Sequence, residues 1–151
     1  MPLDGLALAA LAWELNRALA GGRVAKVLQP LDDQLVLQMR RSRDNANLVI
    51  NVHFRWPGVY TSPGPFEHRL QPPPFCMLLR KYLEGGRLLA VSQPGWERIL
   101  YFIFETAQPI DDVHRVTLVA ELIPRRANLT LVAGVVGTDA NVVILDALDR
   151  K

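Results

Sequence analysis

Cysteine is almost absent from this sequence, since Cys76 is the only one among 151 residues. An internal disulfide is therefore excluded, and the composition fits a reducing compartment. The three histidines, His53, His68 and His114, are scattered, and no Cys/His/Asp spacing is typical of a metal site. We therefore expect no metal ion and no other cofactor, and we interpret Cys76 as a small buried hydrophobic residue rather than a catalytic thiol.

Long apolar runs are also missing, and no stretch approaches the length of a membrane-spanning helix. Residues 6–13, "LALAALAW", have the character of a signal-peptide core, but Asp4 precedes them without any Lys or Arg. Glu14, Asn16 and Arg17 follow them directly. These flanks argue against a signal peptide, so we expect a cytoplasmic protein without membrane contact.

Lysine is scarce as well. The 17 cationic residues comprise 14 arginines and 3 lysines, and the formal net charge is +2. A charge this small excludes a global basic field. Arginine pairs with phosphate in bidentate fashion and stacks on bases better than lysine does, but it is also abundant in proteins from GC-rich genomes. Arginine richness alone is therefore weak support for nucleic-acid binding.

Signatures of common catalytic sites are missing too. The chain contains no P-loop, no glycine-rich phosphate cradle and no Ser-His-Asp constellation. Removal of Met1 would expose a secondary amine at Pro2, which is a possible Schiff-base nucleophile, but no adjacent acid–base group is evident. We therefore expect one domain that is not an enzyme.

The sequence predicts two helices and about nine strands. An apolar stripe at helical spacing predicts a helix over residues 5–20, capped by Asp4 and ended by Gly21-Gly22. The stripe comprises Leu8, Leu11, Leu15 and Leu19. A second helix is expected over residues 75–84, before Gly85-Gly86. Alternating patterns predict strands at residues 23–29, 34–40, 48–54, 58–62, 87–93, 98–105, 114–123, 128–133 and 141–148.

The chain contains an internal repeat. Residues 15–40 align with residues 79–104 at a shift of 64 positions, and eight of the 26 aligned positions are identical. Each copy reads helix, glycine pair, strand, turn, strand, and one copy alone cannot bury both its helix and its sheet face. We therefore predict an α+β fold, a pseudo-symmetric antiparallel β-sandwich of about nine strands with two main helices at its margins.

The two copies differ at the turn between their strands. The first turn reads "PLDDQ", whereas the second reads "PGWER" and contains Trp96, Glu97 and Arg98. These residues suit RNA, because Arg binds a phosphate or base edge, Glu an amino group or ribose hydroxyl, and Trp stacks on a base. The alternative is a surface ion pair of little energetic value. Other cationic groups that would extend such a site, or simply face solvent, are Arg80 and Lys81, Arg40, Arg41 and Arg43, and Arg125 and Arg126.

Five stretches of the chain form a recognisable series: "LDGLALAALAWELN", "GGRVAKVLQP", "PPPFCMLLRKYLEGGRL", "QPGWERIL" and "RANLTLV…VILDAL". In this order they resemble the N-terminal domain of the NFACT proteins. The resemblance covers essentially the whole chain, and "FCMLLRKxLEGG" is a specific motif. It implies a single NFACT N-terminal domain over residues 1–151, an N-terminal part of a longer multidomain protein. The implied fold is similar to the N-terminal domain of the Fpg/MutM formamidopyrimidine-DNA glycosylases.

The resemblance implies a function that composition does not show. NFACT proteins, which include bacterial RqcH and proteins described as fibronectin-binding protein A, act in ribosome-associated quality control. They bind an obstructed large ribosomal subunit that carries peptidyl-tRNA, recruit alanyl-tRNA and promote alanine tailing without an mRNA template. We therefore expect an RNA-binding module for tRNA and the rRNA of the large subunit. Fibronectin is a partner by the family's naming alone.

The resemblance also implies site residues. The family's acidic-Arg pair, implicated in tRNA recruitment, falls on Glu97 and Arg98, although its acid is usually Asp. The family's early Asp falls on Asp4, and we include the cationic residues Arg80 and Lys81 in the predicted nucleic-acid-binding site. The chain departs from the family's common residues at Tyr82, Pro124 and Ala127, which puts any detailed role of the "RRAN" turn in doubt.

Two alternative functions stay open. The first is a glycosylase or abasic-site lyase that uses Pro2, but the glycosylases have Glu after this proline and the chain has Leu3. It predicts a borohydride-trappable adduct with abasic DNA. The second is a surface adhesin that binds fibronectin, which requires an export route that the sequence does not show.

Overall fold

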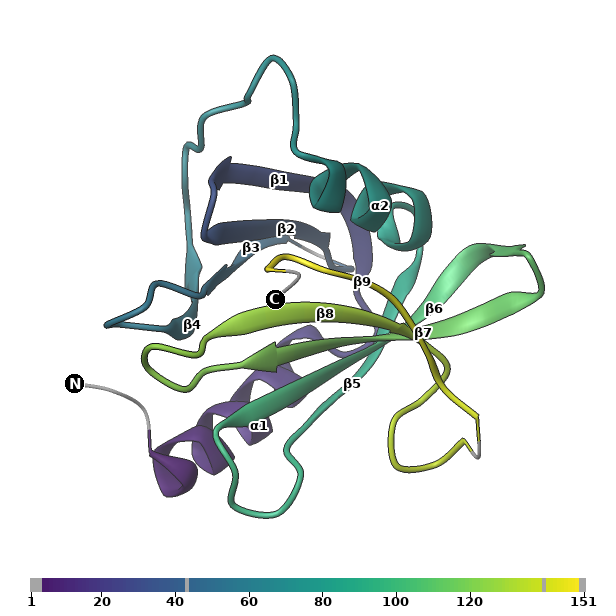
Figure 1. Ribbon diagram of the computed structural model, residues 1–151. Helices are drawn as coiled ribbons and strands as arrows, with labels where there is room; N and C mark the ends of the chain where they lie inside the picture. The colour runs from purple at the N-terminus through teal and green to yellow at the C-terminus, as the bar shows by residue number, and fades with distance from the viewer. Residues whose placement is uncertain (1–3, 43, 140, 150–151) are drawn as a thin grey trace.

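The computed structural model describes residues 4–42, 44–139 and 141–149. Within them the chain forms two helices and nine strands, as the sequence predicts (Figure 1). The helices are α1 (Gly5–Leu19) and α2 (Pro74–Leu83). The strands are β1 (Arg23–Leu31), β2 (Gln34–Arg40), β3 (Asn45–Asn51), β4 (Gly58–Ser62), β5 (Arg87–Ser92), β6 (Ile99–Ile110), β7 (Val113–Glu121), β8 (Asn128–Ala133) and β9 (Val143–Ala147).

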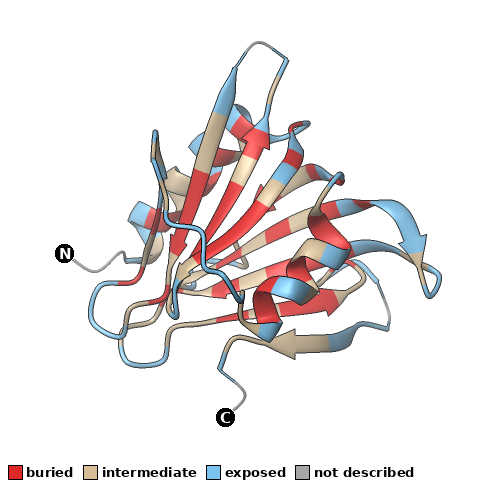
Figure 2. Cartoon of the chain, turned by 90° about the horizontal axis from the view of Figure 1, so that it is seen from above, coloured by how far each residue is buried: buried red, intermediate tan, exposed pale blue. Residues whose placement is uncertain are grey.

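The nine strands form one continuous antiparallel sheet that doubles over on itself, in the order β4-β3-β2-β1-β5-β6-β7-β8-β9. Its two halves, β1 to β4 and β5 to β9, join where β1 meets β5, with Arg23 opposite Arg87. The halves lie one above the other, and one core cluster contains buried residues of both (Figures 1 and 2). The predicted antiparallel β-sandwich is confirmed, and its two layers are the halves of a single sheet.

The internal repeat appears in the structure as a pair of matching glycine turns. Gly21 N–H donates to the carbonyl oxygen of Leu88 at 2.7 Å, and Gly85 N–H donates to that of Val24 at 2.8 Å. Leu88 and Val24 each donate back to the second glycine of the facing pair, both at 2.9 Å. Gly21 and Gly85 have φ values of 91° and 80°, which glycine adopts at little cost. The repeated glycines thus join the two halves as well as ending the helices.

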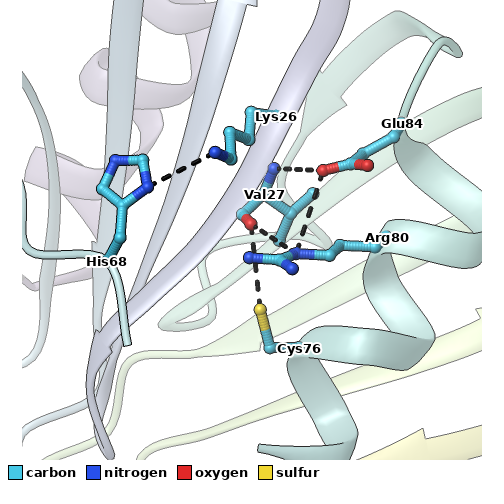
Figure 3. A network of polar contacts seen from close by, with 6 residues as sticks. All are labelled: Lys26, Val27, His68, Cys76, Arg80 and Glu84. Atoms are coloured by element: carbon cyan, nitrogen blue, oxygen red, sulfur yellow. Dashed lines mark hydrogen bonds and ion pairs between the residues drawn. The ribbon is translucent and has the colours of Figure 1, made fainter. Parts of the chain in front are cut away.

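Each helix contacts the half of the sheet that it does not precede, and α2 contacts its own half as well. α1 contacts β5 and β6, whereas α2 contacts β1, β6 and β9. A side chain of α1 and the side chain of Glu84, the C-cap residue of α2, also bind the backbone of the first strand of the other half. Asn16 Oδ1 accepts from Val91 N–H at 2.8 Å. Glu84 Oε2 accepts from Val27 N–H at 2.9 Å (Figure 3). Since both strands have an irregular register just before these residues, the helices satisfy donors near the irregularities.

The end of β3 differs from the prediction. The apolar pattern predicts a strand over residues 48–54, but β3 runs from Asn45 to Asn51. Asn51 Oδ1 accepts a hydrogen bond from His53 N–H at 2.8 Å, and this local bond turns the chain out of the ladder. Phe54 therefore lies in a loop.

The end of β6 also differs, because the strand continues to Ile110 through residues predicted as a loop. Ile110 pairs with Val113, which leaves a two-residue hairpin turn. Asp111 and Asp112 have φ values of 51° and 64°, as a type I′ turn requires, and Asp tolerates this region better than most residues. A turn of this kind extends a hairpin without needing glycine.

Cys76 is fully buried on α2, and its Sγ lies 3.8 Å from the carbonyl oxygen of Val27 (Figure 3). Burial raises the pKa of the Cys76 thiol, an effect that the nearby Arg80 guanidinium partly offsets.

We expect the Cys76 thiol to react with a disulfide reagent at pH 8 on the order of 100-fold more slowly in the folded chain than in the chain unfolded by urea. Equal rates, measured by absorbance, would contradict its burial.

Candidate nucleic-acid interface

The N-terminal end of α1 packs directly against the turn between β5 and β6. A Cβ atom at Gly5 would overlap the carbonyl group of Trp96. The side chain of Gln93 links the two segments, because its Nε2 donates to the carbonyl oxygens of Gly5 (2.9 Å) and Glu97 (2.6 Å). Asp4, which precedes Gly5, is therefore held beside the turn that contains Glu97, although the two are distant in the sequence.

The repeated Gln-Pro pair has a structural role in both halves. Gln29 Nε2 donates to the carbonyl oxygen of Asp32 at 3.1 Å and so closes the turn between β1 and β2. Gln93 closes the turn between β5 and β6 in the same way, and it also reaches α1. The same side chain thus supports a plain turn in one half and a turn joined to a helix in the other.

Asp4 caps α1, as the sequence predicts. Its Oδ1 accepts a hydrogen bond from Ala7 N–H at 2.7 Å, and the residue is exposed. The carboxylate lies at the positive end of the helix dipole, where negative charge is stabilised. Asp4 therefore has a structural role besides any contact with a ligand.

Glu97 and Arg98 form no ion pair and no side-chain hydrogen bond within the described residues. Glu97 is exposed, Arg98 is half-buried, and Trp96 next to them is 71% exposed. The ion pairs of the described ranges lie elsewhere, between Arg41 and Asp44, Arg69 and Asp32, and Arg80 and Glu84. The alternative of a simple surface ion pair is thus not what the structure shows, because Glu97 and Arg98 are unpaired among the described residues, and Trp96 and Glu97 face solvent.

Arg80 and Lys81 lie on α2, away from this turn (Figure 1). Arg80 Nε donates to the carbonyl oxygen of Val27 at 3.0 Å and lies 3.9 Å from Glu84 Oε2, so the guanidinium is engaged in holding α2 on β1 (Figure 3). Lys81 is exposed, with its Nζ 5.4 Å from the centre of the Tyr82 ring. The structure therefore brings Asp4 to the Glu97-Arg98 turn, but it does not bring Arg80 and Lys81 there.

Another cationic residue does lie at this end of the sheet. Arg98 O accepts from Leu122 N–H at 2.8 Å, and the turn that follows β7 contains Arg125. Arg125 N–H in turn donates to the carbonyl oxygen of Phe54, so this turn and the loop between β3 and β4 are adjacent (Figure 1). The sequence run "HFRW" has an aromatic residue on either side of an arginine, a pattern that could have predicted this surface. The apolar alternation over residues 48–54 instead predicted that the run begins inside a strand.

The remaining sequence expectations concern metals, membranes and Pro2. Within the ranges that the structure describes, no group of three or more His, Cys, Asp or Glu side chains is placed to hold a metal ion. No helix there is both long and apolar enough to cross a membrane. Pro2 and Arg43 lie outside the described residues.

The doubled helix-and-sheet unit occurs in the N-terminal domains of proteins of known structure. The fold matches the N-terminal domain of the fibronectin-binding protein PavA from Streptococcus pneumoniae with a TM-score of 0.82 and 28% identity. It matches the N-terminal part of the fibronectin/fibrinogen-binding protein from Streptococcus suis with a TM-score of 0.85 and 30% identity. Each match covers 97% of this chain and 53% of the other.

This chain belongs to the NFACT family, since the family model for the NFACT N-terminal and middle domains matches residues 4–150. It is 33% identical over 149 residues to the Rqc2 homolog RqcH of Bacillus subtilis, covering 98% of this chain and 25% of RqcH. It is 29% identical over 141 residues to the human ribosome quality control complex subunit NEMF, covering 93% and 12%. The family expected from the sequence is confirmed, and the chain spans a quarter or less of these relatives.

Proposed function

We propose that this chain is the RNA-binding module of a ribosome-associated quality control factor. It contributes to binding of tRNA, alanyl-tRNA in particular, and of the large ribosomal subunit with obstructed peptidyl-tRNA during template-free alanine tailing. It acts in the cytoplasm and without catalysis. One observation carries the proposal: the fold brings Asp4, which is distant in the sequence, beside the turn that contains Glu97 and Arg98, whose side chains have no partner among the described residues.

The chemistry of this turn suits RNA. Arg98 offers a planar guanidinium to a phosphate or a base edge, which is a geometry that Lys does not reproduce. Glu97 accepts from an exocyclic amino group or a ribose 2′-hydroxyl, and the exposed Trp96 ring offers a face to an unpaired base. Acidic and cationic groups together favour recognition of a particular nucleotide over plain attraction to phosphate.

The charge of the chain sets how the binding depends on salt. With a net charge of +2, the domain neutralises few phosphates, so its affinity is modest and falls with salt concentration. Phosphate contacts supply most of the affinity of such an interface, and the Glu97-Arg98 turn supplies its specificity.

The proposal is tested by fluorescence anisotropy of labelled tRNA-Ala at low salt, with the Glu97→Ala/Arg98→Ala double variant beside the wild-type chain. We expect the double variant to bind roughly 5- to 150-fold more weakly, because it loses one directional Arg contact and the neighbouring carboxylate.

A matched control is available. The Arg41→Ala/Asp44→Ala variant removes an exposed Arg-acid pair, joined at 2.7 Å, and leaves the net charge unchanged. We expect it to bind tRNA like the wild type. Equal binding by both double variants would leave only diffuse attraction to phosphate and would remove the special role of Glu97 and Arg98.

Fibronectin binding is a second candidate, favoured by the names of the two solved proteins of the same fold. It predicts that the purified chain is retained on immobilised fibronectin and that an excess of tRNA does not displace it. Absence of retention would remove this candidate and leave the RNA-binding proposal unaffected.

A further inference from the structure

The loop between β3 and β4 exposes two large aromatic side chains. Phe54 is 55% exposed and Trp56 is 58% exposed. The Arg55 guanidinium lies 5.3 Å from the centre of the Phe54 ring, and the His53 ring stacks on Phe54 with centroids 4.9 Å apart. Exposed rings usually find a cover or a partner, because they leave a large apolar area in water.

The turn between β7 and β8 forms the other wall of a groove. Phe54, Arg55, Trp56, Pro124 and Arg125 line this aromatic groove, which has a volume of about 620 Å³. Arg125 has a φ of 70°, a conformation that is unfavourable for a residue other than glycine, and its N–H donates to Phe54 O. The strained residue thus holds the turn against the aromatic loop, as strain at binding sites often does.

The charge of the lining selects the kind of occupant. Both charged residues of the groove, Arg55 and Arg125, are cationic and exposed. Aromatic faces flanked by guanidinium groups fit an unpaired base with its neighbouring phosphates, because the rings stack on the base and Arg pairs with phosphate.

We propose that the aromatic groove binds an unpaired nucleotide of a single-stranded RNA segment. The base stacks on Trp56 or Phe54, and Arg55 and Arg125 contact the flanking phosphates. The inference rests on the proposed function, because it extends the RNA path from the Glu97-Arg98 turn. The hydrogen bond between Arg98 and Leu122 places the end of β7, and hence the Arg125 turn, at the same end of the sheet.

The test compares two labelled RNA oligonucleotides of about ten residues, one with bases and one abasic, by anisotropy at low salt. We expect Trp56→Ala to weaken binding of the intact oligonucleotide by roughly 5- to 150-fold, the range expected for loss of one stacked base. Binding of the abasic oligonucleotide should be the same for the variant and the wild type, because that oligonucleotide keeps only its phosphates. The matched control is Trp13→Ala, since Trp13 is also exposed (62%) but lies on α1.

The outcomes separate this proposal from the proposed function. Three results would overturn the proposal for the aromatic groove. The first is that Trp56→Ala and Trp13→Ala weaken binding equally. The others are that the wild type binds both oligonucleotides equally well, or that it binds neither. A preference for a proline-rich peptide over RNA would also overturn it. If only Glu97→Ala/Arg98→Ala weakens tRNA binding, the groove is refuted and the proposed function stands. If only Trp56→Ala weakens binding of RNA that carries bases, the groove stands without the Glu97-Arg98 site.

Discussion

Gly5→Ala is expected to lower the free energy of unfolding by about 1–3 kcal/mol, the usual cost of forcing an extra methyl group into a packed contact. The φ of Gly5 is not positive, so the requirement at this position is for space. The added Cβ would overlap the carbonyl group of Trp96, and a backbone atom cannot move aside as a side chain does. Alanine favours helices over glycine, so helix propensity alone predicts the opposite change.

The same substitution is expected to weaken tRNA binding on the order of tenfold, equivalent to a loss of about 1.4 kcal/mol. Relief of the overlap must separate α1 from the turn between β5 and β6, and this displaces Asp4 from Glu97 and Arg98. Urea unfolding and anisotropy of labelled tRNA-Ala measure the two effects. Lower stability with unchanged binding would mean that the turn binds tRNA independently of α1.

Gly86→Ala is the second substitution with a large expected effect, also about 1–3 kcal/mol of unfolding free energy. A Cβ at Gly86 would lie 2.5 Å from the carbonyl oxygen of Glu105 and 3.0 Å from that of Leu83. Both atoms belong to the backbone, so the strain would fall on the junction where the two halves of the sheet meet.

The pseudo-symmetry supplies a graded series for this measurement. At Gly22, the equivalent of Gly86, the nearest atoms to a Cβ are Leu19 O at 3.1 Å and the flexible Met39 Cε at 3.4 Å. At Gly58 no atom lies within 4 Å. We therefore expect the destabilisation to decrease from Gly86→Ala to Gly22→Ala to Gly58→Ala in urea unfolding. A cost at Gly22 equal to or above that at Gly86 would contradict the closer packing of the second junction.

The elements of the fold could be predicted because their signals are local. The leucine stripe of α1 repeats at helical spacing, and Leu8, Leu15 and Leu19 are buried as expected, while Leu11 packs partly buried against them. The glycine pairs end both helices, and the alternating patterns give the nine strands. One copy of the repeat cannot bury the apolar faces of both its helix and its sheet, so the two copies must pack on each other. The β-sandwich could therefore also be predicted from the sequence.

Strand ends were less predictable, because they depend on single hydrogen bonds. The bond from His53 N–H to Asn51 Oδ1 ends β3 early, and the pair Asp111 and Asp112 carries β6 to its turn without glycine. The pattern of apolar residues predicts neither the early end of β3 nor the extension of β6. This is why the aromatic groove around Phe54 was absent from the site predicted by sequence.

The sequence by itself determined the elements and their pseudo-symmetric doubling, and through family resemblance it predicts Asp4, Glu97 and Arg98 as site residues. Only the tertiary structure decided which residues meet. α1 packs on the second half of the sheet and so holds Asp4 beside the second turn, whereas α2 contacts both halves and its Arg80 binds the backbone of β1. Contacts between distant segments depend on how the sheet folds over on itself. The periodicity of a strand or helix specifies which of its faces is buried, but it does not specify which other element covers that face.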